Sequence, residues 1–108
     1  MILEQFNIYR NCSPQTNKTL PYYMIVQNDY YANLATRVII PLMRPQQLPR
    51  WHQHVVPRIN IEFDSFLLCT PMISNLNNKR IQPQDFVCNL SHARQGVIHS
   101  IDTLITNC

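Results

Sequence analysis

The feature that most constrains the fold of this chain is its last stretch, residues 90–108, the one long segment with a helical period. Apolar residues recur there at i, i+1, i+4, i+7 and i+8, which places them on one face of an α-helix: Val97, Ile98, Ile101, Leu104 and Ile105. Ser91 stands where an N-cap is expected, because its hydroxyl can accept a hydrogen bond from a backbone N–H of the first turn. We therefore predict one amphipathic helix over residues 91–106, with its apolar face against the rest of the chain.

The residues before this helix are dominated by short strand-like segments. These segments are residues 5–10, 22–27, 36–42, 58–63, 65–70 and 81–87. Pro, Asn, Asp and Ser must build the turns between them, because the chain has one glycine. Strands within residues 5–89 followed by one helix predict a mainly β fold, a small twisted antiparallel sheet or partly open barrel with the helix on one face. The length of 108 residues indicates a single domain, residues 1–108.

Two of the strand segments carry more detailed expectations. The apolar run of residues 36–42 predicts a central strand buried on both faces, and Pro41 predicts an interruption of its hydrogen-bond ladder, by a bulge or an edge. In the hairpin of residues 58–70, we expect three alternating apolar side chains to face inward and a tight turn at Asp64 and Ser65. The three inward-facing side chains are Ile59, Ile61 and Phe63.

The charge and hydropathy patterns argue against nucleic-acid and membrane partners. The net charge is +3 and the longest basic run is Lys79-Arg80, so no direct nucleic-acid binding is expected. The first residues lack the basic and apolar regions of a signal peptide, and no apolar run approaches the roughly 20 residues of a transmembrane helix. We therefore expect a cytoplasmic protein, in which cysteines without CxxC spacing are free thiols: Cys12, Cys69, Cys88 and Cys108.

Residue types that carry catalysis are present but form no recognisable pattern. His52 and His54 could bind a metal ion together, but no third ligand follows at a fixed spacing, so no metal is predicted. Glu62 and Asp64 are the one close carboxylate pair, and a solvated position beside a turn explains them better than acid–base catalysis. No cysteine lies in a nucleophile motif, and no glycine-rich loop can hold a phosphate. We expect a protein that is not an enzyme and has no cofactor.

Three features leave alternatives open. The polar loop of residues 11–21 is long enough to carry function, but its length fits a mobile connector equally well. Trp51 is either a contact anchor or a side chain that covers one end of the sheet. Gly96 lies within the predicted helix, where glycine costs about 1 kcal/mol relative to alanine, and it either allows close packing or is tolerated.

Blocks of residues along nearly the whole chain carry a resemblance to a known family. They are Phe6-Asn7-Ile8-Tyr9, Pro21-Tyr22-Tyr23, Val26-Gln27-Asn28-Asp29, Thr36 to Leu42, Pro57 before Ile59 and Ile61, Leu68-Cys69-Thr70 before Met72, Leu90-Ser91 and Ile98 to Leu104. In this order and spacing they resemble the CcdB family of bacterial toxins. The resemblance implies an SH3-like, strongly twisted antiparallel barrel with a C-terminal helix. It also implies a homodimer with the two helices near the two-fold axis.

The function that the resemblance implies is that of the toxin in a type II, plasmid-maintenance toxin–antitoxin system. Such toxins bind the A subunit of DNA gyrase and trap the cleaved-DNA complex, acting as topoisomerase poisons. In the family the last residues of the chain make this contact, and here they are Ile105, Thr106, Asn107 and Cys108. The family commonly ends in Gly-Ile. Asn tolerates positive φ and Cys is a small hydrophobe, whereas Thr106 lacks the aromatic ring of the best-known member.

The resemblance also implies a disordered antitoxin that binds two regions, the loop after the first strand and the segment after the strand of residues 36–42. The corresponding residues here are Arg10, Asn11, Lys18, Met43, Arg44 and Trp51. A net charge of +3 is compatible with an acidic partner. The alternative function is that of a non-toxic CcdB-like homologue, which binds an antitoxin or another partner without poisoning gyrase.

Overall fold

The computed structural model, which describes residues 3–47 and 56–106, contains seven short strands and one α-helix in these ranges. The strands are β1 (Asn7–Arg10), β2 (Tyr22–Ile25), β3 (Thr36–Met43), β4 (Arg58–Ile61), β5 (Asp64–Leu68), β6 (Ser74–Asn77) and β7 (Phe86–Asn89). The helix is α1 (Arg94–Thr106), and short 3-10 turns include η1 (Asp29–Tyr31), η2 (Pro45–Gln47), η4 (Thr70–Met72), η5 (Asn78–Arg80), η6 (Pro83–Asp85) and η7 (Ser91–Ala93). The predicted fold class, a mainly β chain with one C-terminal helix, is confirmed.

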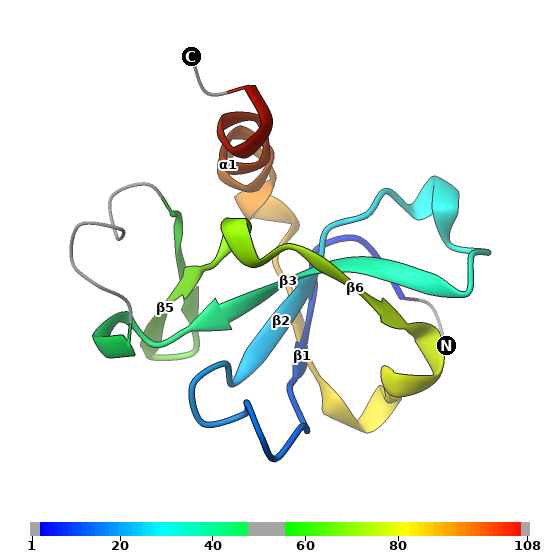
Figure 1. The fold of residues 1–108 in the computed structure, drawn as a ribbon, viewed down its shortest axis with the longest axis horizontal. Coiled ribbons are helices and arrows are strands. Elements are labelled where there is room, and N and C mark those ends of the chain that lie inside the picture. Colours follow the sequence, from blue (N-terminus) through cyan, green and yellow to red (C-terminus); the bar gives the residue numbers. More distant parts are fainter. Residues whose placement is uncertain (1–2, 48–55, 107–108) are drawn as a thin grey trace.

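The strands form one curled antiparallel sheet in the order β4-β5-β3-β2-β1-β7, with β6 paired to β3 beside this path (Figure 1). β3 is the central strand, as predicted. On one side it pairs with β2, and on the other its neighbour changes from β6, opposite Thr36–Ile39, to β5, opposite Leu42 and Met43. Pro41 lies between these two pairings, where its missing N–H breaks no ladder. The interruption expected at Pro41 is therefore a change of neighbour.

A buried core lies on each face of the sheet. The larger core contains Ile8, Met24, Ile40, Leu42, Phe66, Leu68 and, from the helix, Val97. The smaller core, on the other face, contains Leu3, Tyr9, Tyr23, Ile25 and Ile81. Neighbouring residues of β1 such as Ile8 and Tyr9 enter different cores because successive side chains of a strand point to opposite faces. The alternation predicted for residues 5–10 is confirmed.

The β4–β5 hairpin differs from the prediction at its turn. Ile61 pairs with Asp64, so the two turn residues are Glu62 and Phe63 rather than Asp64 and Ser65. Glu62 has φ 57°, the positive value that a two-residue hairpin turn requires at its first position. Phe63 is therefore fully exposed at the tip instead of facing inward, whereas Ile59 and Ile61 are buried as predicted.

The helix also differs from the prediction in its start and in its buried face. Ser91 is not the N-cap: it is the first residue of η7, whose N-cap is Leu90, and its backbone N–H donates to Asn89 Oδ1 at 3.0 Å. The α-helix itself begins at Arg94, after η7. Val97 is buried, and the face against the core continues through Ser100 and the half-buried Ile101 rather than through the whole predicted apolar stripe. The exposed members of that stripe are Ile98 (37%), Leu104 (42%) and Ile105 (75%).

Candidate functional site

The helix α1 rises from one side of the half-barrel and carries the C-terminal end of the chain away from the sheet (Figure 1). Its N-terminal half is anchored by Val97, which is 1% exposed in the larger core. A buried polar contact fixes the middle, because Thr70 Oγ1 donates to Ser100 Oγ at 2.9 Å and Ser100 Oγ donates to the Val97 carbonyl at 2.8 Å. The helix is therefore held firmly at one end while its last turn faces solvent.

The helix offers apolar side chains that the sheet does not cover. Ile98 and Ile105 lie seven residues apart on one face, with the half-buried Ile101 between them. Ile105, predicted from the resemblance as a gyrase contact, is the most exposed of these. Thr106 ends the helix, and the predicted contacts Asn107 and Cys108 lie outside the described residues. An exposed apolar strip on an anchored helix is a typical protein-binding surface.

The loop after β1 is organised by the side chain of Asn11. Its Nδ2 donates to Thr16 Oγ1 at 2.9 Å and to the Leu20 carbonyl at 2.8 Å, while its Oδ1 accepts from the N–H of Ser13 at 3.1 Å. These bonds close residues 11–20 into a compact loop. Asn11, predicted as an antitoxin contact, is therefore a residue that positions the loop, and Arg10 lies at its entrance.

A cationic cavity of about 510 Å³ lies between this loop and η5. Its lining residues are Arg10, Asn11, Cys12, Ser13, Gln15, Tyr23, Leu76, Lys79, Arg80 and Gln82. The lining contains three cationic side chains and no carboxylate. A hydrogen bond to the nearby Asp85 carboxylate raises the pKa of the Cys12 thiol, and burial raises the pKa of Tyr23, so both groups stay neutral at pH 7.

The remaining residues predicted as antitoxin contacts have varied surroundings. Lys18 is exposed in the loop of residues 11–20 but does not line the cavity. Met43, at the end of β3, is 9% exposed, so little of its side chain remains for a contact. The guanidinium carbon of Arg44 lies 5.5 Å from the ring centroid of Phe66, a cation–π contact. Trp51, His52 and His54 lie outside the described residues.

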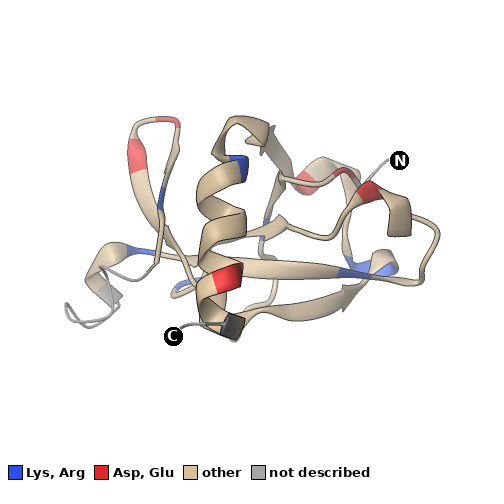
Figure 2. Cartoon of the chain, turned by 90° about the horizontal axis from the view of Figure 1, so that it is seen from above, with Lys and Arg blue, Asp and Glu red and all other residues tan. Residues whose placement is uncertain are grey.

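The two regions predicted to bind the antitoxin, the loop after β1 and the segment after β3, both begin at one end of the sheet. Arg10 pairs with Tyr22, and Tyr22 pairs with Leu42, so the end of β1 and the end of β3 lie on one line across β2. Lys79 and Arg80, which line the cavity, were not predicted as contacts. Their signal was present, since they form the longest basic run of the chain. Elsewhere, Lys and Arg are spread over several elements rather than gathered along one strand or helix (Figure 2).

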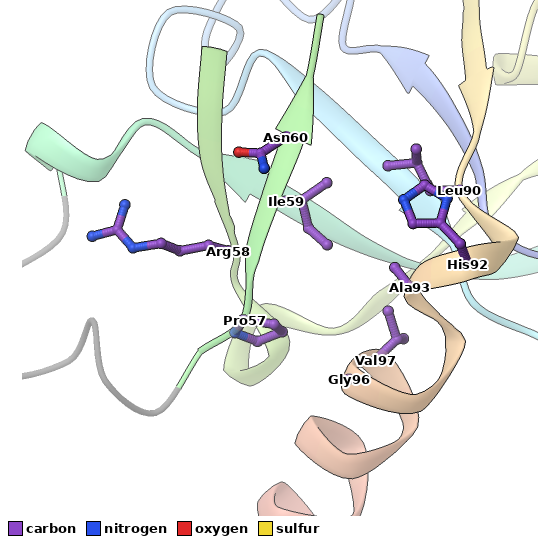
Figure 3. A pocket seen from close by; sticks show the side chains of 9 residues that line it. All are labelled: Pro57, Arg58, Ile59, Asn60, Leu90, His92, Ala93, Gly96 and Val97. Carbon is purple, nitrogen blue, oxygen red and sulfur yellow. The ribbon is translucent and has the colours of Figure 1, made fainter. Parts of the chain in front are cut away.

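A second cavity, of about 330 Å³, separates the edge strand β4 from the start of α1 (Figure 3). Ile59 points across it towards Val97, whereas the side chain of Arg58 points away (Figure 3). Gly96 lines the helical side, and a Cβ added there would meet no atom within 4 Å. Close packing within the chain therefore does not explain the glycine at position 96, and the other interpretation, that Gly96 is tolerated, remains.

Other chemical features are limited in the part of the chain that the structure describes. Cys12, Cys69 and Cys88 are free thiols, and burial raises the pKa of the last two. No three His, Cys, Asp or Glu side chains within residues 3–47 and 56–106 come together in a way that could hold a metal ion. No helix in these ranges combines the length and apolar character needed to cross a membrane.

A curled antiparallel half-barrel with an anchored helix, an exposed apolar helix end and a cationic cavity defines a small β domain that offers surfaces for protein partners. The family model described as CcdB protein matches residues 5–107. The chain therefore belongs to the CcdB family, and the resemblance seen in the sequence is confirmed. This membership suggests a toxin of a toxin–antitoxin pair. No curated protein matches the chain.

Proposed function

We propose that this protein is a non-enzymatic, cytoplasmic toxin that binds the A subunit of bacterial DNA gyrase and traps the cleaved-DNA complex. The observation that carries the proposal is the exposed last turn of α1, where Ile105 is 75% exposed on a helix whose other end is fixed in the core. Together with Thr106, Asn107 and Cys108, Ile105 forms the tail that contacts gyrase. A disordered antitoxin neutralises the toxin by covering it.

The anchoring of the helix supplies the rigidity that such a contact requires. Val97 and the Thr70–Ser100 hydrogen bond fix α1, so the tail does not have to be ordered when it binds. Burying a side chain such as Ile105 contributes about 1.5–3 kcal/mol, which corresponds to roughly ten- to a hundredfold in affinity. One apolar side chain at the helix end therefore has a measurable effect.

A homodimer forms part of the proposal. Ile98 and the half-buried Ile101 leave an apolar strip on α1 that a second copy of the helix can cover, while Ile105 stays free for gyrase. A two-fold axis beside the helices would present two tails together. Insertion of the dimer between two gyrase A subunits requires both tails. Gel filtration with light scattering at micromolar concentration tests this, and a stable monomer would contradict the wedge mechanism.

The test of the toxin function is induced expression in a sensitive bacterium, with growth and accumulation of gyrase–DNA cleavage complexes as readouts. Wild type should arrest growth and accumulate cleaved DNA, whereas Ile105→Ser should lose most of both effects. Phe63→Ser is the matched control, because Phe63 is a fully exposed apolar side chain on the β4–β5 hairpin instead of the helix. Unimpaired growth with no cleaved DNA would exclude gyrase poisoning by this chain.

A non-toxic CcdB-like homologue is the second candidate, favoured by the departure of Asn107 and Cys108 from the Gly-Ile ending of the family. The double substitution Asn107→Gly and Cys108→Ile separates the two candidates. If wild type is harmless and the double variant arrests growth, the chain has kept the fold and lost toxicity at its tail.

A further inference from the structure

The cationic cavity continues into an apolar trough on the same side of the sheet. The trough has a volume of about 360 Å³ and is lined by Asn11, Thr16, Leu20, Tyr22, Tyr23, Ile39, Pro41, Met72, Ser74 and Leu76. Asn11, Tyr23 and Leu76 line both cavities, so the two form one continuous groove. We call this the loop–β6 groove, since its walls are the loop of residues 11–20 and the chain from Met72 to Gln82.

The two halves of the loop–β6 groove differ in chemistry. The first half is bordered by Arg10 at the end of β1 and by Lys79 and Arg80 of η5. The second half is floored by aliphatic and aromatic side chains of β2, β3 and β6. Asp85 is the acidic group that faces this region, and it raises the pKa of the Cys12 thiol. The groove is therefore complementary to a segment with acidic residues at one end and apolar residues at the other.

Both walls of the groove are held by hydrogen bonds within the chain. Asn77 Oδ1 accepts from the N–H of Lys79 at 2.9 Å, and Gln82 Nε2 donates to the Lys79 carbonyl at 2.8 Å. Asn78 Nδ2 donates to the Leu34 carbonyl at 2.8 Å, which ties η5 to the chain before β3. Asn11 fixes the opposite wall through three bonds. A groove with fixed walls binds a flexible segment with a smaller entropic penalty than a mobile surface would.

We propose that the loop–β6 groove binds an acidic, amphipathic segment of the antitoxin in an extended conformation, and that Lys79 and Arg80 select for its carboxylates. This proposal rests on the proposed toxin function and adds a wall, residues 72–82, that the family resemblance did not assign. Carboxylates of the segment lie against Arg10, Lys79 and Arg80, and its apolar side chains fill the trough. A nucleic acid fits the groove less well, because it would leave the apolar half uncovered.

The charges of the groove also determine how fast the partner is captured. Exposed cations attract an acidic disordered chain before contact, and this attraction weakens as salt screens it. Binding of the antitoxin should therefore become weaker with increasing salt, and the cations of the groove should account for a large part of that dependence.

The test uses the full-length toxin and, as probe, the protein encoded by the short reading frame next to the toxin gene, with affinity measured by calorimetry at several salt concentrations. Lys79→Glu and Arg80→Glu should each weaken binding about fivefold and reduce the salt dependence. Arg94→Glu is the matched control, since it makes the same change in net charge at an exposed helix position outside the groove. Equal losses in all three variants, or no loss in the first two, would overturn the proposal.

The apolar half has its own pair of variants. Met72 is 45% exposed in the trough, so Met72→Ser should weaken binding several-fold without unfolding the toxin. Phe63→Ser removes an exposed apolar side chain outside the groove and should leave affinity unchanged. A loss from Phe63→Ser equal to that from Met72→Ser would contradict a specific trough. If wild type does not bind the probe at all, the proposed toxin–antitoxin function is wrong. If wild type binds and the groove variants bind equally well, only the assignment of the groove is wrong.

Discussion

The hydrogen bond between Thr70 and Ser100 should be worth about 1 kcal/mol to the docking of α1 on the sheet. Both side chains are buried, at 2% and 6% exposure, and their hydroxyl oxygens lie 2.9 Å apart. Ser100 also donates to the carbonyl of Val97, and Thr70 lies 3.4 Å from the carbonyl of Leu68. The pair is a bridge between elements distant in sequence, so its loss affects how the helix is held.

The size of each effect follows from which group is left without a partner. Thr70→Val keeps the shape of the side chain but leaves Ser100 Oγ without its donor, at a cost of about 1–2 kcal/mol. Ser100→Ala also loses the bond but gains about 0.5 kcal/mol from the helix propensity of alanine, so the net cost is about 0.5–1 kcal/mol. Replacing both should cost little more than Ser100→Ala alone, which gives a coupling energy of about 1 kcal/mol.

The measurement is urea unfolding of wild type, both single variants and the double variant, followed by circular dichroism at one protein concentration. A 1 kcal/mol loss also lowers the melting temperature by roughly 4 °C in a domain of this size. The control is the exposed pair of Ser13 and Gln15, whose side chains lie 3.0 Å apart and whose coupling should be close to zero. A Thr70–Ser100 coupling no larger than that of the control pair would refute this account of helix docking.

Three further predictions concern single positions. Gly96→Ala should stabilise the protein by about 0.5–1 kcal/mol in urea unfolding, because the added Cβ meets no atom within 4 Å, and a loss would mean that a partner occupies that space. Glu62→Gly should also raise the free energy of unfolding, by up to about 1 kcal/mol, because φ is 57° there. A lower free energy of unfolding would show that Glu62 makes a contact that outweighs its backbone strain. Asp85→Asn should lower the pKa of Cys12, so that iodoacetamide alkylates this thiol faster at pH 8. Asp64→Asn is the control, and an unchanged rate would show that Asp85 does not restrain the thiol.

The fold could be predicted from the sequence where side chains report burial directly. Residues 38–42 are apolar on both sides because β3 has a core on each face, and Ile59 and Ile61 alternate because only one face of β4 is buried. β6 was missed because Ser74–Asn77 contains polar residues that face solvent. Its strand conformation comes from backbone pairing with β3, which no side-chain pattern records.

The candidate site was harder to predict because its parts come from distant segments. Arg10 of β1 and Lys79 of η5 line one cavity although β6, which precedes η5, pairs with β3 and not with β1 or β2. Asn11 looked like a contact residue, but its amide is occupied in closing the loop. A loop residue that satisfies backbone groups and one that binds a partner have the same polar character, so only the hydrogen-bond partners separate them.

The helix shows why periodicity alone could not divide structural from functional residues. Val97 and Ile105 both belong to the predicted apolar stripe, yet one is 1% exposed and the other 75%. A side chain that packs on its own sheet and one that awaits a partner recur at the same helical spacing, so the pattern combines two faces into one. Ser100 takes the buried position between them because its hydroxyl is bonded twice. The apolar residues that the fold leaves exposed are then the ones available for binding. Substitutions at Val97 should lower stability, whereas those at Ile105 should lower partner affinity and leave the unfolding midpoint unchanged.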